Sequence, residues 1–364
     1  MIRPNAGFAA HPPRRVAAQP AARLYLSRMV LYPFPFAARR APLATLLLTA
    51  ALAGILPRAA RAQAVPNPVE RIQNLITFGP AANPKWGDDD HTQTFFFLMP
   101  EKQRQAVYIR VWDADCGGKN DDLKGPADTK TTFTLYGGLG TFSGPQAHDP
   151  HPTNPVPPGR AMLTRTFGAD ANYDGKWFVF GPLNPLEGEL AEEFKGRVFK
   201  VVARGKNGND GNLYRYFFST SPTENIPVEG GNAFTYEYCF RLPATAGKTV
   251  VHLYPFVNDK VVSIKQSNFD MDGGAKINVF SVAKNGQPAT ASADGTWASS
   301  VLPIAPKEHG LSLDFQLESA AKVPNDMVFY VTDQYETALP FFAIPLGGPP
   351  RFQYDVDMKI RPKK

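Results

Sequence analysis

The amino-acid sequence predicts an all-β protein of two tandem antiparallel β-sandwich domains, preceded by a signal segment. Three observations lead to this expectation. After residue 90, short runs of Phe, Tyr, Val and Thr are separated by Gly, Pro, Asn and Asp, which is typical of strands and turns. The order of these runs in the first half recurs in the second half. The first 64 residues contain basic side chains and no acidic one.

The composition of the 364 residues argues against other classes of protein. With 35 prolines and 30 glycines the chain is too rich in helix breakers for a helix bundle, and 12% aromatic residues are too many for a disordered chain. Nine of the 39 basic residues are arginines within the first 64 positions, which leaves 30 basic against 33 acidic side chains. The remainder is mildly acidic, so we expect no nucleic-acid partner.

Residues 1–64 have the order of a secretory signal. Two arginines at 39–40 precede an apolar run at 43–56, and small residues follow at 60–64. The run of about 14 residues is too short to span a bilayer.

We expect cleavage of this segment after Ala62 or Ala64, with translation starting at Met1 or at Met29. The mature protein is then expected in the periplasm, outside the cell or on the cell surface. No later segment is apolar enough to predict a transmembrane span.

The first half contains six predicted strands, at residues 94–98, 107–112, 131–136, 177–180, 198–203 and 213–218. Residues 206–211 between the last two strands favour a hairpin loop, because Gly and Asn tolerate positive φ. Helical periodicity is weak, and only residues 186–194 suggest a short helical turn.

The second half repeats the first in order, and the predicted domains are residues 65–227 and 228–364. The matched segments are 97–100 with 240–243, 107–109 with 250–253, 131–135 with 277–280, 174–177 with 294–297, 183–185 with 304–306, 209–210 with 325–326, and 226–236 with 344–354. A period of about 120 to 140 residues indicates duplicated domains rather than a solenoid.

Two features of the halves leave alternatives open. Residues 352–362 match the opening strand of a unit, so they either close the second sandwich or form an edge for self-association. Cys116 and Cys239 are the two cysteines, and in an exported protein they either form a disulfide or remain free.

Acidic loops are the strongest candidates for a functional site. Carboxylates precede one predicted strand and follow the next, at Asp88, Asp89, Asp90, Asp113, Asp115 and Asp121. Calcium prefers six to eight hard oxygen ligands, and carboxylates two residues apart on a loop can reach one ion.

Asp113, Asp115 and Asp121, after a strand that ends in Val-Trp, resemble the calcium-binding loop of protein kinase C and synaptotagmin membrane-binding domains, which are β-sandwiches. The resemblance covers about a dozen residues and implies that these three are calcium ligands. It also implies a further ligand from Asp88, Asp89 or Asp90 in the neighbouring loop. The whole chain looks like an exported bacterial protein of tandem β-sandwiches.

Two further loops have calcium-like spacing, with oxygens at Asp170, Asn172 and Asp174 in one and at Asp270 and Asp272 in the other. Both begin like an EF-hand loop and lack its final Glu. Asp, Asn and Gly are also ordinary turn residues, so each loop is a calcium site or a plain turn.

The sequence nominates no catalytic residue. His148 and His151 are three positions apart without a third metal ligand, and the chain lacks a Gly-x-Ser-x-Gly elbow and a His-Glu-x-x-His motif. Carboxylates paired in space for glycoside hydrolysis remain open.

The leading hypothesis is an exported, non-enzymatic binding or structural protein that calcium stabilises at its loop ends. Its partner would be a surface protein, an extracellular protein or a glycan. The alternatives are a secreted hydrolase or carbohydrate-active accessory protein that uses the acidic loops, and a surface assembly subunit that pairs through its C-terminal strand.

Overall fold

The computed structural model describes residues 63–144, 146–150, 159–244, 249–272, 274–319 and 324–348, which belong to one unit formed by residues 58–364. The predicted signal segment, apart from its last two residues, and the C-terminal segment 352–362 lie outside the described residues. Both remain predictions.

The described residues form antiparallel sheets, and their only helices are 3-10 turns, which confirms the all-β prediction. The turns are η2 (Pro84–Trp86), η3 (Pro185–Glu187), η4 (Glu192–Phe194) and η5 (Pro306–Glu308). Two of them occupy the stretch where the sequence suggested a helical turn. None of the helices in the described part is long and apolar enough to cross a membrane.

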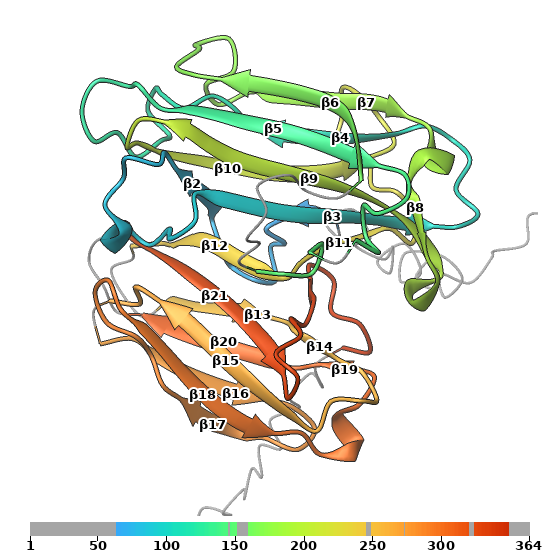
Figure 1. Ribbon diagram of the computed structural model, residues 1–364, viewed down its shortest axis with the longest axis vertical. Coiled ribbons are helices and arrows are strands. Elements are labelled where there is room, and N and C mark those ends of the chain that lie inside the picture. Colours follow the sequence, from blue (N-terminus) through green and yellow to red (C-terminus); the bar gives the residue numbers. More distant parts are fainter. Residues whose placement is uncertain are drawn as a thin grey trace, which may run out of the picture. The chain divides into compact units, whose positions relative to one another are not determined.

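The largest sheet has nine strands and contains segments from both halves of the chain (Figure 1). Its order is β18 (Trp297–Pro303), β15 (Ser263–Phe269), β21 (Asn325–Asp333), β12 (Glu237–Leu242), β2 (Asn74–Phe78), β10 (Gly211–Ser219), β4 (Val107–Trp112) and β7 (Trp177–Leu183), with β1 (Ala64–Val65) beside β10. β12 and β2 pair antiparallel, with Phe240 opposite Leu75, and this pairing joins the two halves.

Three smaller sheets complete the fold. The first has the order β22 (Phe341–Phe342), β11 (Asn232–Thr235), β3 (Thr92–Pro100), β9 (Gly196–Asn207), β5 (Lys130–Gly137) and β6 (Arg160–Phe167), with β8 (Glu189–Ala191) beside β9. The second has the order β13 (Thr249–Leu253), β20 (Asp314–Ser319), β16 (Lys276–Phe280) and β17 (Asn285–Ala289). The third pairs β14 (Phe256–Val257) with β19 (Leu311–Ser312).

Aromatic residues pack these sheets face to face. Phe133 of β5 meets Tyr214 of β10 edge-on, with ring centroids 5.1 Å apart. In the second half, Phe315 of β20 meets Phe329 of β21 at 5.5 Å. The nine-stranded sheet therefore contributes one layer to each half, and one continuous set of buried side chains runs through both.

The same strand order occurs on both sides of the β2–β12 pairing. β2, β10, β4 and β7 correspond in order to β12, β21, β15 and β18, and β3, β9, β5 and β6 correspond to β13, β20, β16 and β17. Several matches made from sequence lie at corresponding places, such as β5 with β16. The match of 107–109 with 250–253 does not lie at corresponding places. Residues 107–109 belong to β4, whereas residues 250–253 belong to β13, which corresponds to β3. Short alternating apolar strands are too similar to be distinguished by sequence.

Cys116 and Cys239 are both buried and unpaired in this fold, which corresponds to the free-thiol alternative.

An ion network ties the loop after β4 to the second half. Arg241 of β12 donates from Nε to Asp326 Oδ1 and from Nη2 to Asp326 Oδ2, both at 2.7 Å, and it also donates to Asp122. The Arg241 side chain is 15% exposed and that of Asp326 is 7% exposed. Each of these charges has lost most of its contact with water, so it is stabilised mainly by the other.

We expect Arg241→Gln to lower the free energy of unfolding by about 3 kcal/mol, because the buried carboxylate of Asp326 would lose the cation that it binds through both oxygens, while Asp122 keeps its ion pair with Lys124. Chemical denaturation measures the change. The matched control is Arg160→Gln, which breaks an exposed pair with Glu187 and is expected to cost less than about 1 kcal/mol. Equal losses in the two variants would contradict this interpretation.

Candidate functional site

The loop after β4 begins with an unusual backbone conformation. Asp113 has a φ of 58°, in the left-handed region, although it is not a glycine. Its N–H donates to the Lys176 carbonyl at 2.8 Å, and its Oδ1 accepts the N–H of Gly175 at 2.6 Å. These two bonds hold the loop before β7 against the loop after β4, and so bring two of the predicted calcium loops together.

Two carboxylates in this place are buried and incompletely paired. Asp113 and Asp115 are 0% and 1% exposed. Asp115 Oδ2 accepts the N–H of Asp170 at 3.0 Å. Asp113 Oδ2 and Asp115 Oδ1 have no hydrogen-bond partner among the described residues. A buried carboxylate oxygen without a donor is costly unless a proton or a cation neutralises it.

The pKa values of these two carboxyl groups are raised, as expected for buried carboxylates in which one oxygen lacks a hydrogen-bond donor. Burial raises the pKa of Asp113 to about 6, and the charges of Asp115 and Asp174 also raise it. Burial likewise raises the pKa of Asp115, with further contributions from Asp174 and Asp170. The two loops thus concentrate negative charge that a cation would relieve.

The other predicted residues of these loops are already engaged. Asp121 accepts the N–H of Gly117 at 2.6 Å and that of Leu213 at 2.7 Å, one on each oxygen. Asp170 Oδ1 accepts both the backbone N–H and the side-chain amide of Asn172.

The Asp88 loop forms a separate acidic group. Asp88 accepts N–H groups of Phe78 and His91 at 2.7 and 2.8 Å, one on each oxygen, and burial raises its pKa to about 7. Burial raises the pKa of Glu237 on β12, and the charges of Asp90, Asp89 and Asp88 raise it further. The sequence reasoning missed Glu237, which is 147 positions from Asp90 and becomes its neighbour only in the fold.

The second half contains a loop built in the same way. Asp270 follows β15 with a φ of 59°, and its Oδ1 accepts the N–H of Gly295 at 2.6 Å. Asp270, Asp272 and Asp294 each offer a carboxylate oxygen within 4.8 Å of the others. The sequence analysis did not name Asp294 as a candidate calcium ligand, although Asp294-Gly295 matches Asp174-Gly175. Lys85 Nζ lies 3.4 Å from Asp294 Oδ2.

A cavity of about 560 Å³ lies between elements of the two halves. Its apolar lining comes from Leu98, Phe194, Tyr236, Phe256, Ala338, Leu339, Pro340 and Leu346, and its polar lining from His148, Glu193, Lys195, Asn258, Asp259, Lys260, Asp333 and Thr337. The volume lies within the range of small-molecule sites, which often occur where two structural units meet.

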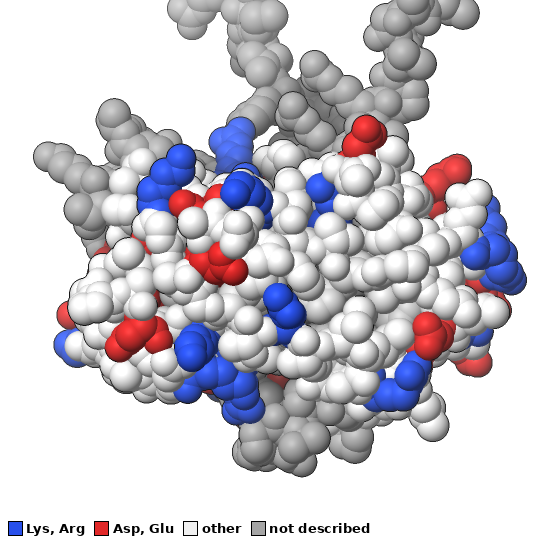
Figure 2. Space-filling model, turned by 90° about the horizontal axis from the view of Figure 1, so that it is seen from above, with Lys and Arg blue, Asp and Glu red and all other residues white. Residues whose placement is uncertain are grey.

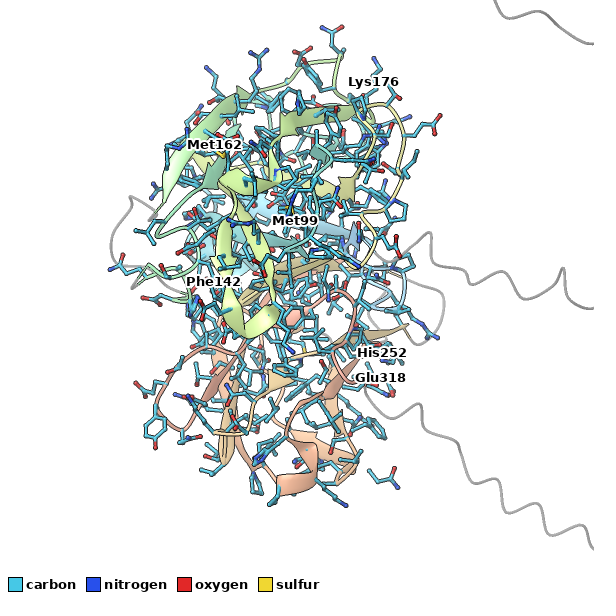
Figure 3. All side chains as sticks on the ribbon, turned by 90° about the vertical axis from the view of Figure 1, so that its right-hand side faces the viewer. Met99, Phe142, Met162, Lys176, His252 and Glu318 are labelled. Atoms are coloured by element: carbon cyan, nitrogen blue, oxygen red, sulfur yellow. The ribbon has the colours of Figure 1, made fainter. Side chains whose placement is uncertain are left out.

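His148 is part of this cavity through aromatic packing. Its ring stacks on Tyr236 with centroids 4.6 Å apart and contacts Phe142 at 4.7 Å. Burial lowers the pKa of His148, so the ring is neutral at physiological pH. Figure 3 shows Phe142, which contacts His148, well separated from Lys176 of the acidic loop and from His252, and neither Lys176 nor His252 lines the cavity.

His252 forms the other polar pair of interest. Its Nδ1 lies 2.9 Å from Asp314 Oδ1, and its ring stacks on Tyr254.

Charges of both signs are scattered over the described residues on the face drawn in Figure 2, without a large patch of one sign. Comparison with known proteins finds no family model and no curated protein that matches this chain. The local geometry therefore carries the functional argument alone.

We expect the metal-free protein to lose stability as the pH rises from about 5 to about 8. Asp113, Asp88, Asp121 and Glu70 have folded-state pKa values of about 6, 7, 8 and 8, raised by burial. The folded state keeps protons that the unfolded state releases above about pH 4. The stability that these four carboxyl groups contribute is therefore fully present below about pH 4. It is lost as the pH rises through their folded-state pKa values.

Urea denaturation in chelator at pH 5, 6.5 and 8 measures this trend. A free energy of unfolding that stays constant or increases over this interval would contradict the assignment of raised pKa values.

Proposed function

We propose that this chain is an exported, non-enzymatic binding protein of two related β-sandwich units, with calcium at its loop ends. The arginine pair, apolar run and small residues at 39–64 support export to the periplasm, the cell surface or the medium. Binding outside the cytoplasm suits a fold of antiparallel sheets whose loops are available for recognition.

The proposed duplication is supported by more than strand order. Asp113 and Asp270 occupy corresponding places after β4 and β15, both in the left-handed region. Each accepts the N–H of a glycine, Gly175 or Gly295, that follows an Asp just before the neighbouring strand of the sheet, β7 or β18. Such a shared side-chain detail favours descent of both halves from one ancestral unit, with a boundary near residue 228.

The observation that carries the binding role is the cavity of about 560 Å³ between the two halves. Aromatic side chains of Phe194, Tyr236 and Phe256 contribute to its apolar surface. Lys195 and Lys260 on its rim are donors, and Glu193 and Asp259 are acceptors.

This lining favours an uncharged, polyhydroxylated ligand. A rim with both signs of charge suits hydroxyl groups, which donate and accept, better than it suits an anion or a cation. The C–H faces of a sugar ring can pack on the aromatic lining. Among the partners expected from sequence, the geometry therefore favours a neutral glycan.

Binding is better supported than hydrolysis. Among the carboxylates with raised pKa values, Asp88, Asp90 and Glu237 influence one another's charge and are the best candidates for acid–base chemistry. The cavity beside Asp90 and Glu237 has a volume of only about 30 Å³, enough for about one water molecule and too small for a sugar ring.

We expect neutral oligosaccharides of glucose, galactose, mannose or N-acetylglucosamine to bind saturably, as measured by calorimetry and saturation-transfer NMR, and to be recovered intact. Phe256→Ala should weaken binding about tenfold, or about 1.4 kcal/mol, by removing a stacking surface. Leu139→Ala, at a residue 88% exposed outside the cavity, is the control.

Absence of saturable binding across this panel would contradict the glycan proposal. Unchanged affinity in Phe256→Ala would remove the cavity as the binding site, and cleavage of the oligosaccharide would support the hydrolase instead.

A further inference from the structure

We infer that the bound glycan carries an anionic group, a carboxylate or a sulfate, which is held in a basic hollow next to the cavity between the two halves. The inference rests on the proposed function, because the cavity is taken to hold the neutral part of the same ligand. The hollow adds a second subsite to that cavity and selects a different chemistry.

The basic hollow is an open space of about 400 Å³ at the end of β3. Its lining consists of Pro100, Glu101, Lys102, Arg104 and Lys195. The first four residues end β3 or follow it, and Lys195 directly precedes β9. β3 and β9 pair antiparallel, with Pro100 opposite Gly196, so the two turns meet at the same end of the sheet (Figure 1). The strand register therefore determines which side chains surround the hollow.

Lys195 connects the basic hollow with the cavity of about 560 Å³, because it lines both. Its backbone is held in place at the end of η4, with a φ of 51° and an N–H that donates to the Glu192 carbonyl at 3.1 Å. The two spaces are thus neighbouring parts of one surface. A ligand longer than the cavity can extend past Lys195 into the hollow.

The two spaces differ in charge. The hollow is lined by three cations and a single carboxylate, that of Glu101. The cavity has two cations, Lys195 and Lys260, and its carboxylates are Glu193, Asp259 and Asp333. The formal charge of the lining is therefore positive in the hollow and slightly negative in the cavity, so an anionic group of the ligand is attracted to the hollow alone.

The cations of the hollow are available to a ligand. Within the part of the chain that the structure describes, neither Lys102 nor Lys195 forms an ion pair or a side-chain hydrogen bond. Arg104 donates from Nη1 to the carbonyl oxygens of Glu101 and Gln103, the latter at 2.9 Å, which holds the guanidinium against its own turn. Both bonds use the same nitrogen, so Nε and Nη2 remain as donors.

This donor set suits an oxyanion attached to a sugar. A guanidinium can bind two oxygens of a carboxylate or a sulfate at once, and lysine ammonium groups add charge from the side. Because the hollow is open to water, each ion pair contributes little and salt weakens it. Three cations around one anionic group should therefore raise affinity about tenfold at low salt and much less at high salt.

The experiment uses the full chain and titration calorimetry. The probes are the neutral oligosaccharides of the panel above and two derivatives of each, one oxidised at C6 of its terminal sugar to a carboxylate and one with a single sulfate ester. At about 20 mM salt an acidic derivative should bind about tenfold more tightly than its neutral parent. The advantage should fall below about threefold at about 500 mM salt, where the Debye length is about 4 Å.

Matched variants locate the anionic group. Lys102→Gln and Lys195→Gln should each reduce the ratio of acidic to neutral affinity at least about threefold. Lys276→Gln makes the same change in net charge at an exposed lysine of β16 that lines neither space, and should leave the ratio unchanged. Phe256→Ala should weaken binding of neutral and acidic forms by the same factor. All three lysines are exposed, so these variants are expected to fold.

The outcomes separate this inference from the proposed function. Tighter binding of either acidic form supports the hollow, and the tighter of the two identifies the anion. Equal or weaker binding of both acidic forms would overturn the anionic subsite and leave the glycan cavity in place. A preference that persists in Lys102→Gln and Lys195→Gln, or that falls equally in Lys276→Gln, would also overturn it. Absence of binding for every probe would overturn the proposed function itself.

Discussion

The pairing of β12 with β2, together with that of β11 with β3 in the second large sheet, is the contact on which the rest of the fold depends. Without it, the nine-stranded sheet would become two sheets, each with an unpaired edge of backbone N–H and C=O groups. The buried aromatic layer continues across this pairing, and Arg241 adds an ionic link from β12 to the loop after β4.

The acidic loops show how a strand end becomes a charged site. Asp113 leaves β4 in a left-handed conformation, and its contacts with Gly175 and Lys176 bring a second loop against the first. Backbone N–H groups donate to one oxygen of Asp113 and one of Asp115, while the other oxygen of each has no partner among the described residues. Proton binding and cation binding are alternative ways to neutralise the bare oxygens, so the stability of this end of the fold is linked to both.

The sequence predicted the fold class and the acidic loops, because both rest on local chemistry. Branched and aromatic runs indicate strands wherever they pack, and Asp-rich turns are visible without a structure. The division of roles among the carboxylates was not predictable. Asp113 and Asp121 are equivalent as residue types, and only the fold shows that Asp121 accepts an N–H on each oxygen whereas Asp113 Oδ2 has no partner among the described residues. Glu237, Asp294 and the cavity were missed because distant segments create them.

The two free thiols are natural probes of local unfolding in this protein. Cys116 lies in the acidic loop and Cys239 on β12, each at most 2% exposed, and burial raises the pKa of both. A buried, protonated thiol is a poor nucleophile, so both should resist alkylating reagents while the fold is closed. The alkylation rate of Cys116 would then measure local unfolding of the acidic loop, and that of Cys239 would measure local unfolding of the central sheet, without any engineered probe.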